Sequence, residues 1–334
     1  MLKSDVLIIG AGPVGIFASF KAGMLGMSSI IADSLNEVGG QCSALYPEKP
    51  IYDIPAYPKI LAKDLVQNLQ EQAAFFNPQY LLETRIISFE KEQDLFVSTC
   101  DNGLLITSKI IIIASGAGAF GPNRPPLDFI ENYENKSVFY KVNQIQDFAA
   151  KTIIIAGGGD SAIDWALNLA DSAKKIYLIH RRAKFRASPA SIAAIEQLQK
   201  EAIVEILTPY QLSKINGEDG YLTKVTISNI ETGEEKILDG DILLPFFGLT
   251  SDLGPLKNWG LNIINNTIEV DQSSQMTNIE GIYAVGDICN YKGKLKLIMT
   301  GFSECATALH HSYNKVFDGK TLHFSHSTSM KFEN

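Results

Sequence analysis

A strand–helix–strand order occurs twice along this chain in the pattern of apolar and polar positions. Each time, a short and almost uninterrupted apolar run, which suits a strand buried on both faces of a parallel sheet, precedes a segment with apolar residues at helical spacing. A second apolar run then follows. The first copy comprises residues 5–9, 14–25 and 29–32, and the second comprises residues 151–156, 161–170 and 175–179. The pattern predicts two βαβ units that lie about one domain apart.

Three further apolar runs predict strands at residues 110–114, 242–244 and 281–285. The first two are followed by segments rich in Gly, Pro and small residues, at 115–122 and 245–249, which are typical of a chain crossing or hinge. We therefore expect an α/β fold with two Rossmann-like, three-layer domains, the second inserted into a discontinuous first. The expected bounds are residues 1–116 with 246–334 for the first domain, and residues 117–245 for the second.

The composition agrees with two globular domains and excludes several classes of protein. The chain has 334 residues, 46% of them hydrophobic and 20% charged, which is ordinary for a globular protein, and its net charge of −8 argues against nucleic acid as a partner. No apolar run approaches the ~20 residues of a membrane helix, so we expect no membrane span.

The cysteines are four and lie far apart in sequence: Cys42, Cys100, Cys289 and Cys305. They form no C-x-x-C pair, so we expect no zinc knuckle, no other metal site and a reducing, cytoplasmic setting. A spatial pair between Cys42 and Cys289 stays open.

The first βαβ unit carries a dinucleotide-binding pattern. Residues 10–15 read Gly-Ala-Gly-Pro-Val-Gly, a G-x-G-x-x-G whose glycines permit a tight turn, the approach of a pyrophosphate and close helix–strand packing. Asp33 ends the second strand eighteen positions after Gly15, where an acid accepts hydrogen bonds from a ribose diol. Gly10, Gly12, Gly15 and Asp33 therefore predict a site for FAD or NAD. The alternative is a glycine-rich turn of another α/β protein.

The second βαβ unit carries a related pattern with the opposite charge. Residues 157–162 read Gly-Gly-Gly-Asp-Ser-Ala, a G-x-G-x-x-A, and Arg181 follows nineteen positions after Ala162, where an acid would otherwise stand. Arginines at this strand end suit the 2′-phosphate of NADPH, which a carboxylate would repel. The alternative is a solvated surface turn. The predicted NADPH contacts are Gly157, Gly159, Asp160, Ser161, Ala162, Arg181, Arg182 and Arg186. Two such sites in one chain indicate hydride transfer between a nicotinamide and a flavin.

These motifs resemble those of the two-domain flavoproteins built like thioredoxin reductase, over essentially the whole chain. The resemblance rests on residues 10–15, 39–41, 157–162, 180–187 and 286–288. It is closest to the thioredoxin-reductase-like ferredoxin–NADP reductases, because of three further segments: residues 45–49, 257–261 and 326–329. One feature of thioredoxin reductases is missing, since residues 139–145 contain no C-x-x-C. Without that dithiol, electrons have no route from the flavin to thioredoxin.

The resemblance implies a FAD-binding first domain, an NADPH-binding second domain and ferredoxin or flavodoxin as electron partner. It implies a FAD site formed by Gly10, Gly12, Gly15, Asp33, Gln41, Tyr46, Ile86, Phe120, Asp287 and Thr328. Tyr46 would stack on the isoalloxazine, and His326 would cover its opposite face, from the partner subunit of a homodimer. Alternatively, Ile86 belongs to the core, Phe120 packs a hinge and His326 is a surface residue.

Two other functions stay open beside the ferredoxin reductase. One is an NADPH-dependent reductase of a quinone, a small disulfide or a separate redox protein. The other is a nucleotide-binding module without enzymatic activity. Docking of an acidic ferredoxin on an acidic chain needs a local basic patch, and Lys292, Lys294 and Lys296 are the predicted patch, or else a solvated loop.

Overall fold

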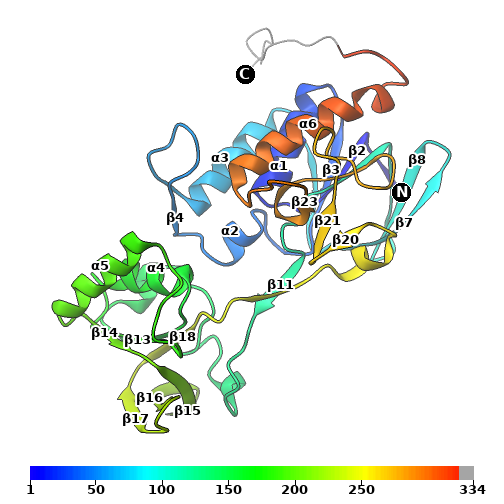
Figure 1. Ribbon diagram of the computed structural model, residues 1–334. Coiled ribbons are helices and arrows are strands. Elements are labelled where there is room, and N and C mark those ends of the chain that lie inside the picture. The colour runs from blue at the N-terminus through cyan, green and yellow to red at the C-terminus, as the bar shows by residue number, and fades with distance from the viewer. Residues whose placement is uncertain (323–334) are drawn as a thin grey trace. The chain divides into compact units, whose positions relative to one another are not determined.

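The computed structural model describes residues 1–322, apart from the side chains of residues 119, 120 and 249–251 (Figure 1). The chain divides into two compact units: the first comprises residues 1–120 and the chain from residue 251 onwards, and the second residues 121–250. The crossing segments, β11 (Ala119–Pro122) and β19 (Leu249–Asp252), pair with each other in a two-stranded sheet. The domain bounds expected from the sequence fall after residues 116 and 245, whereas those of the compact units fall after residues 120 and 250.

The first unit is built on a five-stranded parallel sheet. Its strand order is β22 (Ile282–Ala284), β10 (Ile110–Ile113), β2 (Val6–Ile9), β3 (Ser29–Ala32) and β6 (Gln79–Leu81). Every neighbouring pair runs parallel, with Ile8 opposite Ile31 on one side and Ile112 on the other. This is the buried parallel sheet that the uninterrupted apolar runs predict.

Alternate residues of these strands serve two separate cores. Ile8 and Ile112 face the helices α1 (Pro13–Met24) and α6 (Ile298–Val316), which lie side by side with α3 (Ala62–Ala74) in Figure 1. Leu7 and Ile111 face a second sheet on the other side. That sheet has the order β1 (Leu2–Lys3), β9 (Leu105–Ser108), β8 (Leu95–Cys100) and β7 (Ile86–Glu92). In it, β7, β8 and β9 run antiparallel, and β1 pairs with β9 in parallel. The first unit therefore has three layers.

The second unit repeats this plan at a smaller size. Its parallel sheet has the order β14 (Val204–Leu207), β13 (Lys175–Ile179), β12 (Thr152–Ala156) and β18 (Ile242–Pro245). Helices α4 (Asp160–Leu169) and α5 (Pro189–Lys200) pack together beside it. On the other face, Ile154 and Leu243 share a core with the antiparallel strands β15 (Tyr210–Glu218), β16 (Tyr221–Asn229) and β17 (Glu235–Asp239). The predicted α/β class with two Rossmann-like units is thus confirmed.

Short elements complete the chain. They are α2 (Gln41–Ala44), β4 (Pro50–Ile51), β5 (Ile60–Leu61), β20 (Ile263–Ile264), β21 (Thr267–Glu269), β23 (Cys289–Asn290) and the 3-10 turns η1 (Ile130–Asn132), η2 (Ile145–Phe148), η3 (Gly254–Asn258) and η4 (Gly286–Ile288). Between residues 1 and 322, no helix has both the length and the apolar character needed to cross a membrane.

Candidate nucleotide-binding sites

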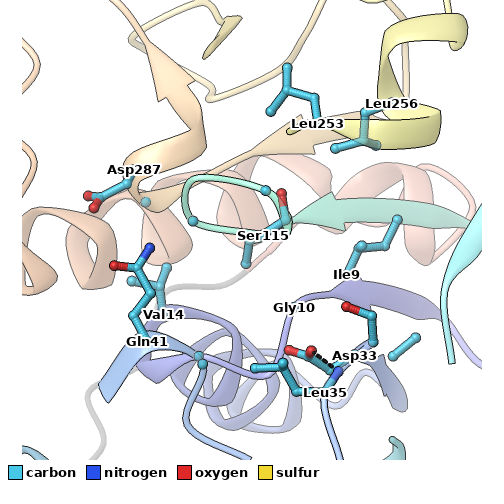
Figure 2. Close-up of a pocket in the computed structure, with 18 of the residues that line it drawn as sticks. Ile9, Gly10, Val14, Asp33, Leu35, Gln41, Ser115, Leu253, Leu256 and Asp287 are labelled. Atoms are coloured by element: carbon cyan, nitrogen blue, oxygen red, sulfur yellow. Dashed lines mark hydrogen bonds between the residues drawn. The ribbon is translucent and has the colours of Figure 1, made fainter. Parts of the chain in front are cut away.

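A cavity of about 380 Å³ opens in the first unit where β2, β3 and β10 end (Figure 2). Its volume falls in the range of ~300–1,000 Å³ that small-molecule sites occupy. The carboxyl ends of parallel strands are where open α/β sheets bind their ligands. The structure brings seven of the predicted residues to this cavity: Gly10, Gly12, Asp33, Gln41, Tyr46, Ile86 and Asp287.

The turn between β2 and α1 requires glycine at two positions. Gly10 has φ +109°, and a Cβ there would lie 2.5 Å from the carbonyl oxygen of Ala114. A Cβ on Gly15 would lie 1.8 Å from the carbonyl oxygen of Gly10, so Gly15 serves the packing of α1 on β2 and does not line the cavity. Helix α1 begins after Gly12 with no side chain capping it, so its first N–H groups stay available to an anion.

Asp33 fixes this turn through its carboxylate. Oδ2 accepts a hydrogen bond from the Ala11 N–H at 2.6 Å, and Oδ1 accepts one from the Leu35 N–H at 2.9 Å. Burial raises the pKa of Asp33, and the backbone hydrogen bonds partly oppose that rise. Each carboxylate oxygen has a further lone pair, so Asp33 can accept from a ligand hydroxyl as well.

The Gly39–Gly40 segment lies against the same turn. The Gly39 N–H donates to the carbonyl oxygen of Ala11 at 2.8 Å, and a Cβ on Gly12 would lie 4.0 Å from the Cα of Gly40. Figure 2 shows Gln41, which follows Gly40, and Asp287 at one end of the cavity, with Asp33 at the other. The site is thus elongated, with an acidic side chain at each end.

Cys42, which is buried, and Tyr46, which is partly buried, contact each other in the cavity wall. The Cys42 thiol lies 3.9 Å from the Tyr46 hydroxyl, and burial, with Asp287 nearby, raises the pKa of Cys42 to about 11. Cys42 is therefore a neutral thiol at physiological pH. All four cysteines are free and buried, so the pairing of Cys42 with Cys289 that the sequence left open does not occur.

Sequence reasoning missed several residues of the cavity wall. Ser115 is the clearest, because its hydroxyl is buried there and has no hydrogen-bond partner in the described part of the chain. Thr84 and Arg85 directly precede β7. Leu253 directly precedes η3, and Leu256 lies within it. These residues belong to no motif, and the packing of loops brings them together. The unpaired Ser115 hydroxyl, the glycine turn after β2 and the uncapped start of α1 fit an extended dinucleotide such as FAD.

Four further predictions have different outcomes. Ile86 is only 4% exposed and belongs to the core, as the alternative interpretation expects, and it also lines the cavity. Its contact with FAD stays a prediction. Phe120 lies in β11, and its side chain is outside the described residues, as are His326 and Thr328 altogether.

The glycine turn of the second unit lies between β12 and α4. A Cβ on Gly157 would lie 2.6 Å from the carbonyl oxygen of Phe246, and one on Gly158 would lie 2.1 Å from the His180 ring. Gly159 differs, because nothing lies within 4 Å of its Cβ position, and it precedes α4 with no side chain capping that helix. Asp160 and Ser161 begin the helix and are exposed, whereas Ala162 is buried. The helix end is therefore open to an anion.

The loop that follows β13 carries the three arginines, and two hydrogen bonds join it to this glycine turn. The Arg186 N–H donates to the carbonyl oxygen of Gly158 at 2.7 Å, and the Ser188 N–H donates to the Asp160 carboxylate at 3.3 Å. Arg181, Arg182 and Arg186 are exposed, and among these three only Arg186 is held at the turn, through its backbone N–H. Asp160 ties the loop to the turn through its carboxylate, and its contact with NADPH stays a prediction.

The His180 ring packs against the glycine turn at Gly158. The ring also stacks on Phe185, with centroids 5.3 Å apart. Burial lowers the pKa of His180, and the three arginines lower it further, against a hydrogen bond with the Lys184 backbone that raises it. The lowered pKa favours the neutral imidazole, which therefore adds no charge beside the three arginines.

The predicted basic patch is wrong at its centre. Lys292 and Lys296 are exposed, but the side chain of Lys294 is only 5% exposed and forms an ion pair with Glu304 of α6. The sequence reading treated three neighbouring lysines alike, because the acid that buries one of them stands ten residues further along the chain.

Comparisons with known proteins agree with this geometry. Residues 4–309 match the family described as pyridine nucleotide-disulphide oxidoreductase. A protein of Rickettsia rickettsii named ferredoxin–NADP reductase is 56% identical over 98% of this chain and 96% of its own length. One of the same name from Rickettsia prowazekii is 52% identical over 100% of this chain and 99% of its own.

Solved structures of thioredoxin reductases share the fold. The Lactococcus lactis enzyme matches with a TM-score of 0.78 and 25% identity, over 94% of this chain and 99% of its own. The T. acidophilum enzyme matches with a TM-score of 0.80 and 24% identity, over 95% of this chain and 100% of its own.

Proposed function

Because this chain belongs to the pyridine nucleotide-disulphide oxidoreductase family and groups with its ferredoxin–NADP reductases, we propose that it exchanges electrons between NADPH and ferredoxin, with FAD in the first unit and NADPH in the second. The observation that carries the proposal is a difference in charge between the two glycine turns. The strand next to each turn is followed closely by a charged residue, which is acidic in the first unit and basic in the second. Asp33 stands at one, and Arg181 with Arg182 at the other. One turn suits an unphosphorylated ribose and the other a 2′-phosphate.

In the first unit, the residues of the cavity bind and orient the flavin nucleotide. The free N–H groups at the start of α1 would receive the pyrophosphate beside Gly12, and Asp33 would accept from the adenosine ribose. Tyr46, Gln41 and Asp287 lie where the ribityl chain and the ring system would extend. Bound FAD supplies the chemistry, since a flavin takes a hydride from NADPH and releases electrons singly.

In the second unit, charge selects the nicotinamide cofactor. Arg181, Arg182 and Arg186 would surround the 2′-phosphate, and the open start of α4 after Gly159 would receive the pyrophosphate. His180 holds the turn under both contacts without adding a charge.

No side-chain acid, base or nucleophile is needed for this reaction. The one thiol that lines the cavity, Cys42, has a raised pKa and no disulfide partner among the described residues. Residues 139–145 contain no cysteine, so a dithiol relay to thioredoxin has no counterpart here. Flavodoxin in place of ferredoxin, the homodimer in which His326 covers a partner's flavin, and the cytoplasmic location remain predictions.

Anaerobic reduction followed by a choice of acceptors tests the proposal. The purified protein should be yellow, and NADPH should bleach its visible flavin absorption. Ferredoxin should then restore the absorption, whereas thioredoxin should not. Faster recovery with a quinone or a small disulfide would assign the protein to another acceptor. A colourless protein that takes up no FAD would contradict the proposal altogether.

A further inference from the structure

A buried ion pair lies beside the cavity and belongs to no motif. Glu304, on α6, is 3% exposed, and the side chain of Lys294, in the loop before α6, is 5% exposed. One carboxylate oxygen of Glu304 accepts hydrogen bonds from the Lys294 ammonium and from the Tyr291 hydroxyl, the latter at 2.8 Å. Two charges withdrawn from water in this way are costly to bury, and a packed apolar pair would often be as stable.

The second oxygen of Glu304 holds the turn that carries Asp287. It accepts the backbone N–H of Gly286 at 2.7 Å and contacts the Cys289 thiol at 3.5 Å. Burial and the nearby Glu304 raise the pKa of Cys289 to about 12, so this thiol stays a donor. Gly286 has φ +78° and starts η4, directly before Asp287, which lines the cavity. The carboxylate thus fixes the backbone one residue from a predicted flavin contact.

The same helix packs against the start of α1. A Cβ on Gly301, one turn before Glu304, would lie 2.5 Å from Val14 and 3.4 Å from the Cα of Gly286. The Cys305 thiol donates to the carbonyl oxygen of Val14 at 3.4 Å. Helix α6, which carries Glu304, therefore contacts both the turn before Asp287 and the start of α1, where the pyrophosphate would bind.

We propose that Glu304, paired with Lys294, is a positioning residue for the FAD site, because its carboxylate holds the Gly286 N–H and so orients Asp287 toward the cavity. The inference rests on the proposed function for the identity of the ligand. Groups that orient the protein ligands of a metal ion commonly change the metal affinity by about 10–100-fold when they are removed, and we expect an effect of this order on FAD.

Two neutral double variants separate positioning from charge burial. Lys294→Met with Glu304→Gln keeps an acceptor for the Gly286 N–H, whereas Lys294→Met with Glu304→Met removes that acceptor at similar side-chain size. Apoprotein of each is titrated with FAD by flavin fluorescence, and its thermal midpoint is measured without ligand. We expect the Gln variant to bind FAD within about threefold of the wild type, and the Met variant to bind about tenfold or more weakly.

The matched control is Lys315→Met. Lys315 lies near the C-terminal end of α6, and its substitution breaks an ion pair with Glu280, which precedes β22. This variant should leave the FAD affinity unchanged. Equal FAD affinity of the two double variants would overturn the proposal. If the acceptor-free variant does not fold, Glu304→Asp takes its place, because it keeps the charge and shortens the reach to Gly286. Wild-type affinity in Glu304→Asp would equally overturn the proposal. Failure of wild-type apoprotein to bind FAD is a different result, which refutes the proposed function itself.

Discussion

Asp33 shows how one side chain serves both fold and ligand. Its two oxygens hold the Ala11 and Leu35 N–H groups, which shape the glycine turn, and the carboxylate is still exposed to the cavity. Burial raises its pKa above the ordinary value of 3.8 in spite of these hydrogen bonds. The folded chain therefore binds more protons than the unfolded chain just above that pH, and this group's contribution to stability falls as the pH rises through the interval.

Asp33→Asn should remove that pH dependence. The free energy of unfolding of the variant, minus that of the wild type, should increase from the ordinary pKa of 3.8 to the raised value and then level off. Urea unfolding of the apoprotein across the acidic range measures it. Asp271→Asn is the control with opposite sign, because hydrogen bonds from Ser273 and Ser274 lower the pKa of Asp271. A flat difference for Asp33→Asn would contradict the assigned shift.

The arginines of the second unit predict a cofactor preference. Arg181→Ala with Arg182→Ala removes two exposed guanidinium groups that would bind the 2′-phosphate, at a cost of about 1.5–3 kcal/mol for each charged hydrogen bond. The KM for NADPH should therefore rise by at least about tenfold, and the KM for NADH should change little. Steady-state reduction of a dye compares the two. Lys200→Ala, at the exposed end of α5, is the control. Equal losses for both nucleotides would exclude a phosphate-binding role.

At this scale the sequence predicts motif residues and misses those placed by packing. Asp33 and Arg181 stand at fixed distances from a glycine turn, so spacing alone identifies them. Ser115 has no such register, because its position in the cavity depends on how the loop after β10 packs. The burial of Lys294 depends on Glu304 in another element, and no local pattern indicates it.

At the scale of elements, two glycines of the turn between β12 and α4 have different roles, one in packing and one in leaving space for the ligand. Gly157→Ala should destabilise the protein by about 1–3 kcal/mol, because its Cβ would collide with the Phe246 backbone. Gly159→Ala should leave stability nearly unchanged, because its Cβ position is open, but should weaken NADPH, since the methyl group occupies the approach to α4. Thermal unfolding and NADP+ titration of both variants measure the contrast. The same profile in both would refute this division.

The elements themselves were predictable where both faces of a strand are buried. The uninterrupted runs at β2, β10 and β12 indicate strands because helices cover one face of each parallel sheet and a second sheet covers the other. The antiparallel strands β7 and β15 gave no such signal, since most of their residues are exposed. Their apolar and polar residues follow no regular alternation, so their positions are known only from the hydrophobic cores to which they contribute.

For the whole molecule, the insertion of one unit into the other has a testable consequence. The second unit has its own parallel sheet and core, and the segments that bound it, β11 and β19, pair with each other, so its two ends lie together. Residues 121–250 expressed alone should therefore fold cooperatively and bind NADP+ but not FAD. Circular dichroism during heating and calorimetric titration check this. An excised segment with Arg181→Ala and Arg182→Ala should fold and fail to bind, and a segment that stays unfolded would contradict the independence of the unit.

The four thiols lend themselves to chemical labelling. Cys42, Cys100, Cys289 and Cys305 are all buried, and all belong to the first unit, because residues 121–250 contain no cysteine. Burial also raises the pKa of each thiol, which keeps it unreactive while its surroundings stay closed. Alkylation followed residue by residue by mass spectrometry therefore reports local opening of the first unit alone. A ligand that fills the cavity should slow the modification of Cys42, in the cavity wall, more than that of Cys100 in β8.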